Sequence, residues 1–259
     1  MPIFHQTAPI LRKINLGTQI VSLVMRAPEM AQAVQPGQFI MVRVREDIHP
    51  LLRRAYSVSR IFPEESLLEI MIQKAGRGSS ILLQKEEGEM VDILGPLGSS
   101  FQFFEKEKPA ILVGGGIGIA PMFFLGQMLG NAGIPFQILF GGRSHANVFL
   151  LPEFEGQMSF CTEDGSFARK GLITDLLEEK LRELPGAQVF ACGPNVMLRA
   201  VANLCEQYGA SCQISMEAPM ACGVGVCMGC PVPVKTGAYQ YVCKDGPVFN
   251  ATMIDFERL

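Results

Sequence analysis

The sequence has little net charge, no long uninterrupted apolar run and no recognisable export signal. A formal net charge of -3 gives no global electrostatic attraction to nucleic acid or to an anionic membrane surface. Residues 109–142 contain no charged residue, but they are interrupted by Gly114, Gly115, Gly116, Gly118, Pro121 and Pro135. Because a membrane-spanning helix needs about 20 consecutive apolar residues, we expect no membrane span here. The N-terminus does not resemble a signal peptide, which favours a cytoplasmic protein with reduced thiols.

The composition indicates a folded protein with more than one domain. At 259 residues, the chain can form two domains and a short additional unit. Its 48% apolar content and 27 glycines are typical of an α/β or β-rich fold.

Four of the eight cysteines lie near the C-terminus in the spacing C-x4-C-x2-C-x12-C: Cys222, Cys227, Cys230 and Cys243. This spacing matches the plant-type ligand set of a [2Fe-2S] cluster. Glycines at 223, 225 and 229 are expected to adopt positive φ and to direct backbone N–H groups at sulfur. A structural zinc site and disulfides are the alternatives, but zinc sites usually pair two C-x2-C hooks. The other four cysteines follow no ligand spacing and are expected to be small buried residues: Cys161, Cys192, Cys205 and Cys212.

The first part of the chain, residues 1–103, predicts a small antiparallel β-barrel. Its short strand-like runs are separated by turn signals, and they cover Ile20–Met25, Gln38–Val44, Tyr56–Ser59 and Leu67–Ile72. Only Ser79–Gln84 is predicted to be helical in this part. A charged, proline-terminated stretch at residues 105–109 predicts a hinge between domains.

Beyond the hinge, strands alternate with helices, and this pattern predicts a parallel α/β sheet over residues 109–213. The predicted strands are Ala110–Val113, Phe136–Phe140, Gln157–Cys161 and Gln188–Ala191, and the predicted helices are Pro121–Asn131, Gly171–Leu184 and Pro194–Tyr208. Residues 214–259 form a third unit that is too short to bury a core of its own. We expect the cluster to stabilise it while it packs on the other domains.

Two patches of the barrel could bind a flavin nucleotide. In Arg54-Ala-Tyr-Ser57, a guanidinium, an aromatic ring and a hydroxyl could meet a phosphate, a flavin ring and its polar edge, although the same residues could simply begin a strand. Gly76-Arg-Gly-Ser-Ser80 precedes an apolar helix, and its free amides could hold a pyrophosphate or only cap that helix.

The sheet domain begins with a strand, a glycine-rich turn (Gly114, Gly115, Gly116 and Gly118) and a proline in the first turn of a helix. Such a turn lets a dinucleotide approach the backbone at a helix N-terminus, although it could also serve tight packing alone. Cys192-Gly-Pro194 ends another strand at the edge where such sheets bind ligands. The second strand is followed by Arg143 and not by an acidic residue, so the pattern alone favours NADP over NAD.

Taken together in this order, the R-x-Y-S, G-x-G-S-S, G-G-G-I-G-I-A-P and C-G-P elements resemble the ferredoxin-NADP reductase superfamily. Residues 215–230, with the cysteine motif, resemble the electron-transfer subunits of NAD-dependent, type B dihydroorotate dehydrogenases, and the resemblance covers essentially the whole chain. It implies three cofactor regions: FAD contacts at Arg54, Ala55, Tyr56, Ser57, Met71, Ile72, Gln73, Gly78 and Ser79; nicotinamide contacts at the glycine turn, Cys192, Gly193 and Pro194; and cluster ligands at the four cysteines. The family more often has proline and an aliphatic residue where Ala55 and Tyr56 stand, and arginine where Gln73 stands.

The resemblance also implies a function in pyrimidine synthesis. An FMN-containing partner would oxidise dihydroorotate, and the cluster would pass electrons singly to FAD, which would transfer hydride to the co-substrate NAD. The usual assembly has two copies of each subunit. No side chain of this chain is expected to act as an acid or base in hydride transfer. Two interpretations of Glu217 stay open: it is a polar group of the site, or it is a solvated loop charge. The alternatives are a reductase of an oxygenase or ferredoxin-type carrier, a subunit of a sulfide dehydrogenase or ferredoxin:NAD(P) oxidoreductase, and a zinc-stapled interaction protein.

Overall fold

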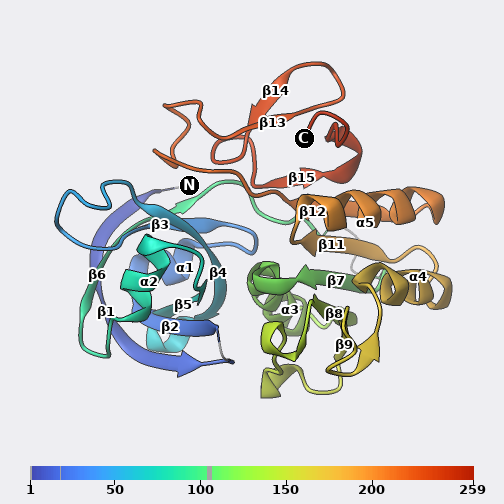
Figure 1. Cartoon of the computed structure of the whole chain (residues 1–259), viewed down its shortest axis with the longest axis horizontal. Helices are drawn as coiled ribbons and strands as arrows, with labels where there is room; N and C mark the ends of the chain where they lie inside the picture. The colour runs from blue at the N-terminus through green and yellow to red at the C-terminus, as the bar shows by residue number, and fades with distance from the viewer. Residues whose placement is uncertain (1, 18, 104–106) are drawn as a thin grey trace.

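The computed structural model describes residues 2–17, 19–103 and 107–259, and it contains three packed units (Figure 1). A β-barrel lies on the left of Figure 1, an α/β sheet on the right, and a small module that contains the C-terminus above them. The predicted hinge at residues 105–109 falls partly outside the described residues. The predicted combination of an antiparallel barrel, a parallel sheet and a small C-terminal unit is confirmed.

Six antiparallel strands close the barrel in the order β1-β2-β5-β4-β3-β6. They are β1 (Phe4–Asn15), β2 (Ile20–Arg26), β3 (Phe39–Arg43), β4 (Arg54–Phe62), β5 (Leu67–Gln73) and β6 (Met90–Leu97). The sequence did not predict β1 or β6. β1 is mostly half-buried or exposed and contains Pro9, and β6 contains Gly95-Pro96, which is a turn signal in most sequences.

Two helices accompany the barrel: α1 (Pro28–Ala33) and α2 (Arg77–Leu83). The prediction of a single helix in this domain is therefore wrong, whereas the helix that was predicted is present as α2. α1 has only six residues, so no helical periodicity can be recognised in its sequence. It forms because a proline stands in its first turn and Met30 is fully buried in the barrel core.

The α/β domain contains a seven-stranded sheet in the order β10-β9-β8-β7-β11-β12-β15. Its strands are β7 (Ala110–Gly115), β8 (Phe136–Gly142), β9 (Met158–Thr162), β10 (Arg169–Lys170), β11 (Gln188–Cys192), β12 (Ser211–Ser215) and β15 (Val248–Asn250), and its helices are α3 (Ala120–Asn131), α4 (Ile173–Glu183) and α5 (Asn195–Gln207). The four predicted strands and three predicted helices are confirmed within a few residues. β10, β12 and β15 were not predicted, and among the described strands of this sheet β15 is the one that runs antiparallel to its neighbour.

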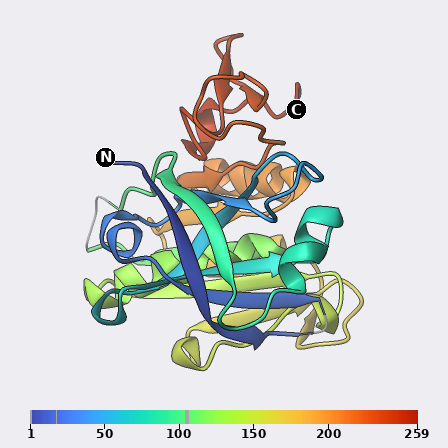
Figure 2. The same cartoon turned by 90° about the vertical axis from the view of Figure 1, so that its left-hand side faces the viewer.

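The C-terminal unit contributes a strand to this sheet as well as packing beside it. Its hairpin of β13 (Pro231–Pro233) and β14 (Tyr239–Tyr241) projects above the other units, as Figure 2 shows, while β15 pairs with β12. The backbone N–H of Met216 also donates to the carbonyl of Pro247 at 2.9 Å. Within the described residues, no helix is long and apolar enough to cross a membrane.

Side chains of the sheet domain enter the core of the barrel. Phe124 of α3 is fully buried and belongs to the barrel core, and burial of such a side chain contributes about 1.5–3 kcal/mol. Phe101, just after the barrel, packs edge to face on Phe190 of β11 with ring centroids 5.7 Å apart. These contacts hold the two domains together beside the cavities described next.

Candidate functional site

A cavity of about 250 Å³, here called the barrel cavity, lies where the three units meet. Ala55, Tyr56 and Ser57 line it from β4, and Met71 and Gln73 line it from β5. The remaining walls come from Phe39, Ala75, Ile117, Ala120, Pro121, residues 215–218, Met220 and Pro247. The chain that leaves β12 therefore forms part of this wall only two residues before the first cysteine of the quartet.

A second cavity of about 620 Å³, here called the sheet cavity, lies at the carboxyl ends of the parallel strands. Gly115 lines it at the end of β7, Gly116 and Gly118 line it just after that strand, and Gly193 and Pro194 line it after β11. Arg143 follows β8, and Glu163 follows β9. Ligands bind at this edge in open α/β sheets, so its position fits a dinucleotide site.

The two cavities share Gln73, Ile117 and Glu217, so they are neighbouring parts of one cleft. The Glu217 side chain is exposed, yet the cleft walls limit its hydration and raise the pKa of its carboxyl group. Burial, followed by the charge of Glu217, raises the pKa of the Cys192 thiol well above its ordinary value. A carboxylate and a neutral thiol thus lie near the junction of the two cavities.

Arg54 and Gly78 do not line the barrel cavity, but they contact each other. A Cβ atom on Gly78 would lie 2.7 Å from Nε of Arg54, so only glycine allows this guanidinium to lie across the start of α2. The Ser79 hydroxyl accepts hydrogen bonds from the backbone N–H groups of Ala75 and Gly76, at 2.9 and 3.0 Å. The loop is therefore held in shape by its own serine, and the guanidinium supplies positive charge beside it.

Burial raises the pKa of Tyr56 to about 12, although the positive charge of Arg54 opposes this effect. The phenol is consequently neutral at physiological pH. A neutral, partly buried ring with one hydroxyl suits contact with a flat aromatic ligand.

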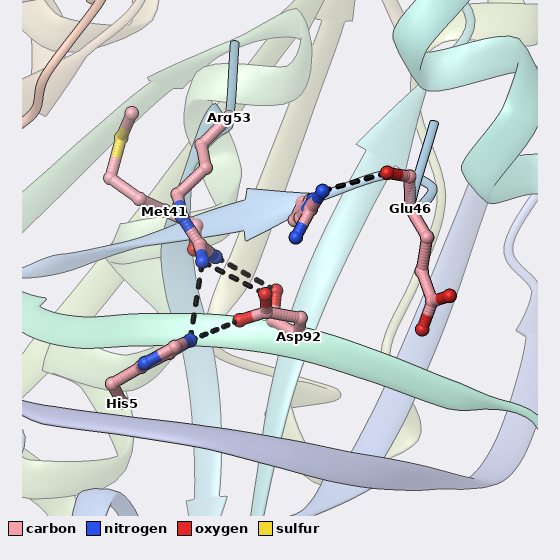
Figure 3. Close-up of polar contacts among 6 residues, drawn as sticks. His5, Met41, Glu46, Arg53 and Asp92 are labelled. Carbon is pink, nitrogen blue, oxygen red and sulfur yellow. Dashed lines mark hydrogen bonds and ion pairs between the residues drawn. The ribbon is translucent and has the colours of Figure 1, made fainter. Parts of the chain in front are cut away.

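Arg53 anchors the start of β4 to two neighbouring strands (Figure 3). Its Nη1 donates to the carbonyl oxygens of Met41 and Asp92 at 3.4 and 3.2 Å, and its Nη2 donates to Oδ2 of Asp92 at 2.9 Å. His5 lies on the other side of the same carboxylate, with Nε2 2.8 Å from Oδ1. Met41 in turn supports the cysteine loop, because a Cβ atom on Gly223 would lie 2.5 Å from its Cγ.

The tight turn after β7 depends on Gly118. A Cβ atom at this position would lie 2.4 Å from the carbonyl oxygen of Cys192, which is closer than any side chain can approach. The turn therefore lies directly on the end of β11 and brings two predicted nicotinamide elements together. Gly114 is packed against Ile119 in the same turn and does not line the sheet cavity.

The four cysteines of the quartet lie as two close pairs. Cys230 Sγ is 3.3 Å from Cys243 Sγ, the side chains of Cys222 and Cys227 are hydrogen-bonded to each other, and the backbone N–H of Cys227 donates to Cys222 Sγ at 3.4 Å. The N–H groups of Gly225 and Cys243 also point at sulfur, at 3.2 and 3.4 Å. No three His, Cys, Asp or Glu side chains within the described ranges converge to hold a single metal ion. Two thiol pairs with amide donors fit the ligand requirement of a two-iron cluster, which needs two cysteines for each iron.

The loop shifts the pKa values of two thiols of the quartet in opposite directions. Backbone N–H donors, chiefly that of Cys227, lower the pKa of Cys222 to about 6. Burial raises the pKa of Cys243 to about 12, and the adjacent thiol of Cys230 acts in the same direction. The loop geometry matches the prediction at Gly223 and Gly225, with φ of 73° and 80°, but the prediction for residue 229 is wrong. The third positive φ, 56°, belongs to Met228, so the turn comes one residue earlier.

The structure brings most of the predicted site residues to the cleft. Ala55, Tyr56, Ser57, Met71 and Gln73 line the barrel cavity, and Gly115, Gly116, Gly118, Gly193 and Pro194 line the sheet cavity. Ile72 is fully buried, because successive side chains of a strand point to opposite faces, so only its backbone is near the cleft. Cys192 is also buried behind the sheet cavity, and the other three cysteines without ligand spacing are buried as predicted.

Sequence reasoning left the role of Glu217 open and assigned no site role to Ile117 or Glu163. Of the two interpretations left open for Glu217, the structure favours the polar group of the site, because this exposed side chain lines both cavities. The end of β9 could have identified Glu163, since it lies at the carboxyl edge of the sheet. No local pattern could have identified Glu217, whose position depends on the path from β12 to the cysteines.

Comparison with protein families agrees with this organisation. Residues 8–102 match the oxidoreductase FAD-binding domain, and residues 112–203 match the oxidoreductase NAD-binding domain. Residues 217–255 match the iron-sulfur cluster binding domain of dihydroorotate dehydrogenase B. The chain is 39% identical over 236 residues to a protein of Geobacillus thermodenitrificans named dihydroorotate dehydrogenase B (NAD(+)), electron transfer subunit, covering 88% of this chain and 90% of the relative. The chain belongs to this family.

A second family member, from Geobacillus kaustophilus, is 40% identical and covers 84% of this chain and 85% of its own. Among solved structures, an NADH-dependent reduced ferredoxin-NADP oxidoreductase superposes with a TM-score of 0.87 at 27% identity, covering 97% of this chain and 91% of that chain. The ferredoxin reductase of carbazole 1,9a-dioxygenase shares the fold, with a TM-score of 0.70 at 21% identity, over 81% of this chain and 67% of that chain. As a member of the family, the chain is an oxidoreductase subunit with FAD-, NAD- and iron–sulfur-binding domains.

Proposed function

We propose that this chain carries electrons from an FMN-containing dihydroorotate dehydrogenase subunit to NAD+ in pyrimidine synthesis. The observation that carries the proposal is the path of the chain after β12, where residues 215–218 and Met220 line the barrel cavity and Cys222 of the quartet follows two residues later. When bound, the cluster supplies one-electron transfer, and FAD supplies the exchange of one-electron for hydride chemistry. Residues of this chain hold these groups close together.

In this proposal, the barrel cavity holds FAD through Ala55, Tyr56, Ser57, Met71 and Gln73. The pyrophosphate would lie near Arg54 and the backbone of residues 78 and 79, where the guanidinium gives a charge-assisted contact. The division into domains at 1–103, 109–213 and 214–259 is part of the proposal, supported by the end of β6 at Leu97 and the start of β7 at Ala110.

The nicotinamide nucleotide would occupy the sheet cavity, with Ile117 and Gln73 at the junction with FAD. We propose NAD and not NADP as the co-substrate. Arg143 could attract a 2′-phosphate, but Glu163 lines the same cavity and would repel it. This carboxylate takes the place of the acidic residue that sequence analysis did not find directly after β8.

The partner would dock on the cysteine loop. Val224, Val226 and Met228 are exposed by 42%, 79% and 59%, which is unusual for three apolar side chains within five residues. The proposal includes an FMN subunit as the partner and two copies of each subunit. A cytoplasmic location is also proposed, supported by eight free cysteines, all of which lie within the described residues.

The test is an anaerobic assay of the reconstituted complex with dihydroorotate and NAD+. We expect NADH to form, and we expect Cys230→Ser to abolish this reaction while NADH still reduces FAD. Cys205→Ser is the matched control, because Cys205 is a buried cysteine outside the quartet. A native partner without FMN, or a wild-type complex that forms no NADH from dihydroorotate, would contradict the proposal.

A second candidate is a reductase subunit of a ferredoxin:NAD(P) oxidoreductase or sulfide dehydrogenase complex. It is favoured by the superposition with the NADH-dependent reduced ferredoxin-NADP oxidoreductase over almost the entire chain. In the same assay, this candidate predicts NAD(P)+ reduction with reduced ferredoxin, or with sulfide, and no reaction with dihydroorotate.

A further inference from the structure

Arg60, near the end of β4, connects the barrel to the sheet domain. Its Nη2 donates to Glu69 Oε1 at 2.9 Å, and its Nε bonds the other oxygen of that carboxylate. Glu69 is fully buried, and the hydroxyl of Ser22 donates to it. The free end of the guanidinium, Nη1, forms an ion pair with Glu153, in the one-turn helix Pro152–Phe154 of the sheet domain. Arg60 is therefore fixed on the barrel side and extends across the domain boundary.

The next residue of β4 makes a second connection to the sheet domain. The side-chain amide of Gln127, on α3, accepts from the N–H of Ile61 at 3.1 Å and donates to its carbonyl oxygen at 2.7 Å. Phe124 lies one turn before Gln127 on the same face of α3 and enters the barrel core. Phe154, beside Glu153, stacks on Phe123 of α3 with ring centroids 5.4 Å apart. The ion pair and the amide thus belong to one rigid contact, here called the β4–α3 clamp (Arg60, Ile61, Gln127 and Glu153).

Three residues of the β4–α3 clamp, Arg60, Ile61 and Gln127, lie on the same two elements that line the cleft. Ser57 of β4 lines the barrel cavity, and Arg60 is three residues further along, or about 10 Å at the rise of a strand. Pro121 of α3 lines the same cavity, and Gln127 is six residues further along, or about 9 Å at the rise of a helix. A change at the clamp would therefore alter the relative position of the two cavity walls.

We propose that the β4–α3 clamp is a positioning device that sets the distance between nicotinamide and flavin. This inference rests on the proposed function, because it assumes that NAD(H) and FAD occupy the two cavities. In the step concerned, a hydride with two electrons leaves NADH, which becomes NAD+, and reduces FAD. Such a transfer requires near-contact distance, and a misplacement of about 1 Å can reduce its rate by about 100-fold. Arg60, Gln127 and Glu153 act through placement and do not line the cavities.

The test uses the full chain loaded with FAD and cluster, with Glu153→Gln and Gln127→Met combined. Both changes lie on the sheet-domain side, so Arg60 keeps its pairing with buried Glu69 and the barrel remains folded. In anaerobic rapid mixing with NADH, we expect the limiting rate of flavin reduction to fall about tenfold. The NADH concentration at half-maximal rate should change less than about twofold, because the cavity residues are intact. The charge-transfer absorbance between reduced flavin and NAD+ should weaken, and amide hydrogen exchange of peptides containing Ile61 should accelerate.

Arg12→Gln is the matched control. Arg12 and Arg60 both lie over the ring of Phe62, at 5.1 and 5.5 Å, but among the described residues Arg12 pairs only with Glu65 of the barrel. Its loss should leave the limiting rate and the charge-transfer absorbance unchanged. An unchanged rate in the double variant, or an equal decrease with Arg12→Gln, would overturn the clamp. Failure of the wild-type chain to accept hydride from NADH would instead overturn the proposed function.

Discussion

The ionised carboxylate of Glu217, at the junction of the two cavities, lowers the free energy of unfolding. The cleft walls raise the pKa of this group, which means that the folded chain holds its proton more tightly than the unfolded chain. The folded state is therefore favoured relative to the unfolded state below the ordinary pKa of 4.5 and loses this advantage as pH rises through the raised value. Near neutral pH, the ionised group destabilises the fold.

We accordingly expect Glu217→Gln to increase the free energy of unfolding at neutral pH. The gain should be below about 1 kcal/mol, because the side chain is exposed and screened by water. It should disappear at pH values well below 4.5, where the carboxyl group is protonated in both states. Denaturant unfolding at several pH values measures it. Glu206→Gln, at an exposed position of α5, controls for the general loss of one negative charge, and a gain that persists in acid would contradict the explanation.

The cysteine quartet and Glu217 differ in how far sequence can identify them. The quartet has a local spacing fixed by the geometry of the cluster, so its four members could be named without a structure. Glu217 belongs to no local sequence pattern. It lines both cavities because the chain runs from β12 past the barrel at this point. Site residues that depend on the packing of three units could not be predicted in this way.

The turn between β7 and α3 joins the sheet cavity to the barrel cavity. It lies on the end of β11 without space for a Cβ atom at Gly118, and its helix inserts Phe124 into the barrel. The strand, glycine turn and helix could be predicted because their pattern is local and strong. The barrel strands β1 and β6 could not, since β1 is only partly buried and a Gly-Pro pair interrupts β6.

Gly118→Ala should destabilise the chain by about 1–3 kcal/mol, because the new methyl group would overlap the carbonyl oxygen of Cys192. It should also weaken NAD(H) binding, since the turn must move away from the end of β11. Thermal unfolding and nucleotide titration measure the two effects.

Gly130→Ala is the control for this substitution on the same segment. Within the described part of the chain, its Cβ atom would meet only Phe136, at an ordinary contact distance of 3.6 Å, and alanine favours the helix. We expect unchanged or slightly higher stability and unchanged nucleotide binding. Equal losses in the two variants would show that the close approach at Gly118 is not the cause.

At the scale of the whole molecule, the cysteine loop is the exposed end of a path that begins in the sheet cavity. Val226→Asp should weaken binding of the proposed FMN-containing partner at least tenfold, because a charge would be desolvated in the interface, and binding to the immobilised partner measures it. The visible spectrum of the cluster reports whether the loop remains intact.

Leu150→Asp provides the control for partner binding. Leu150 is 45% exposed and lies in the sheet domain, away from the cysteine loop in sequence. The Leu150→Asp substitution should leave partner binding unchanged. If Val226→Asp binds the partner as tightly as the wild-type chain, the docking face lies elsewhere.

The pairing of β15 with β12 connects the cluster module to the protection of a sheet edge. β12 would be an edge strand without β15, and an open edge presents unpaired N–H and C=O groups to other chains. Because β15 follows the last cysteine by only a few residues, oxidative loss of the iron would loosen the strand that covers this edge. Oxygen damage to such a chain would then lead to aggregation through the sheet as well as to loss of electron transfer.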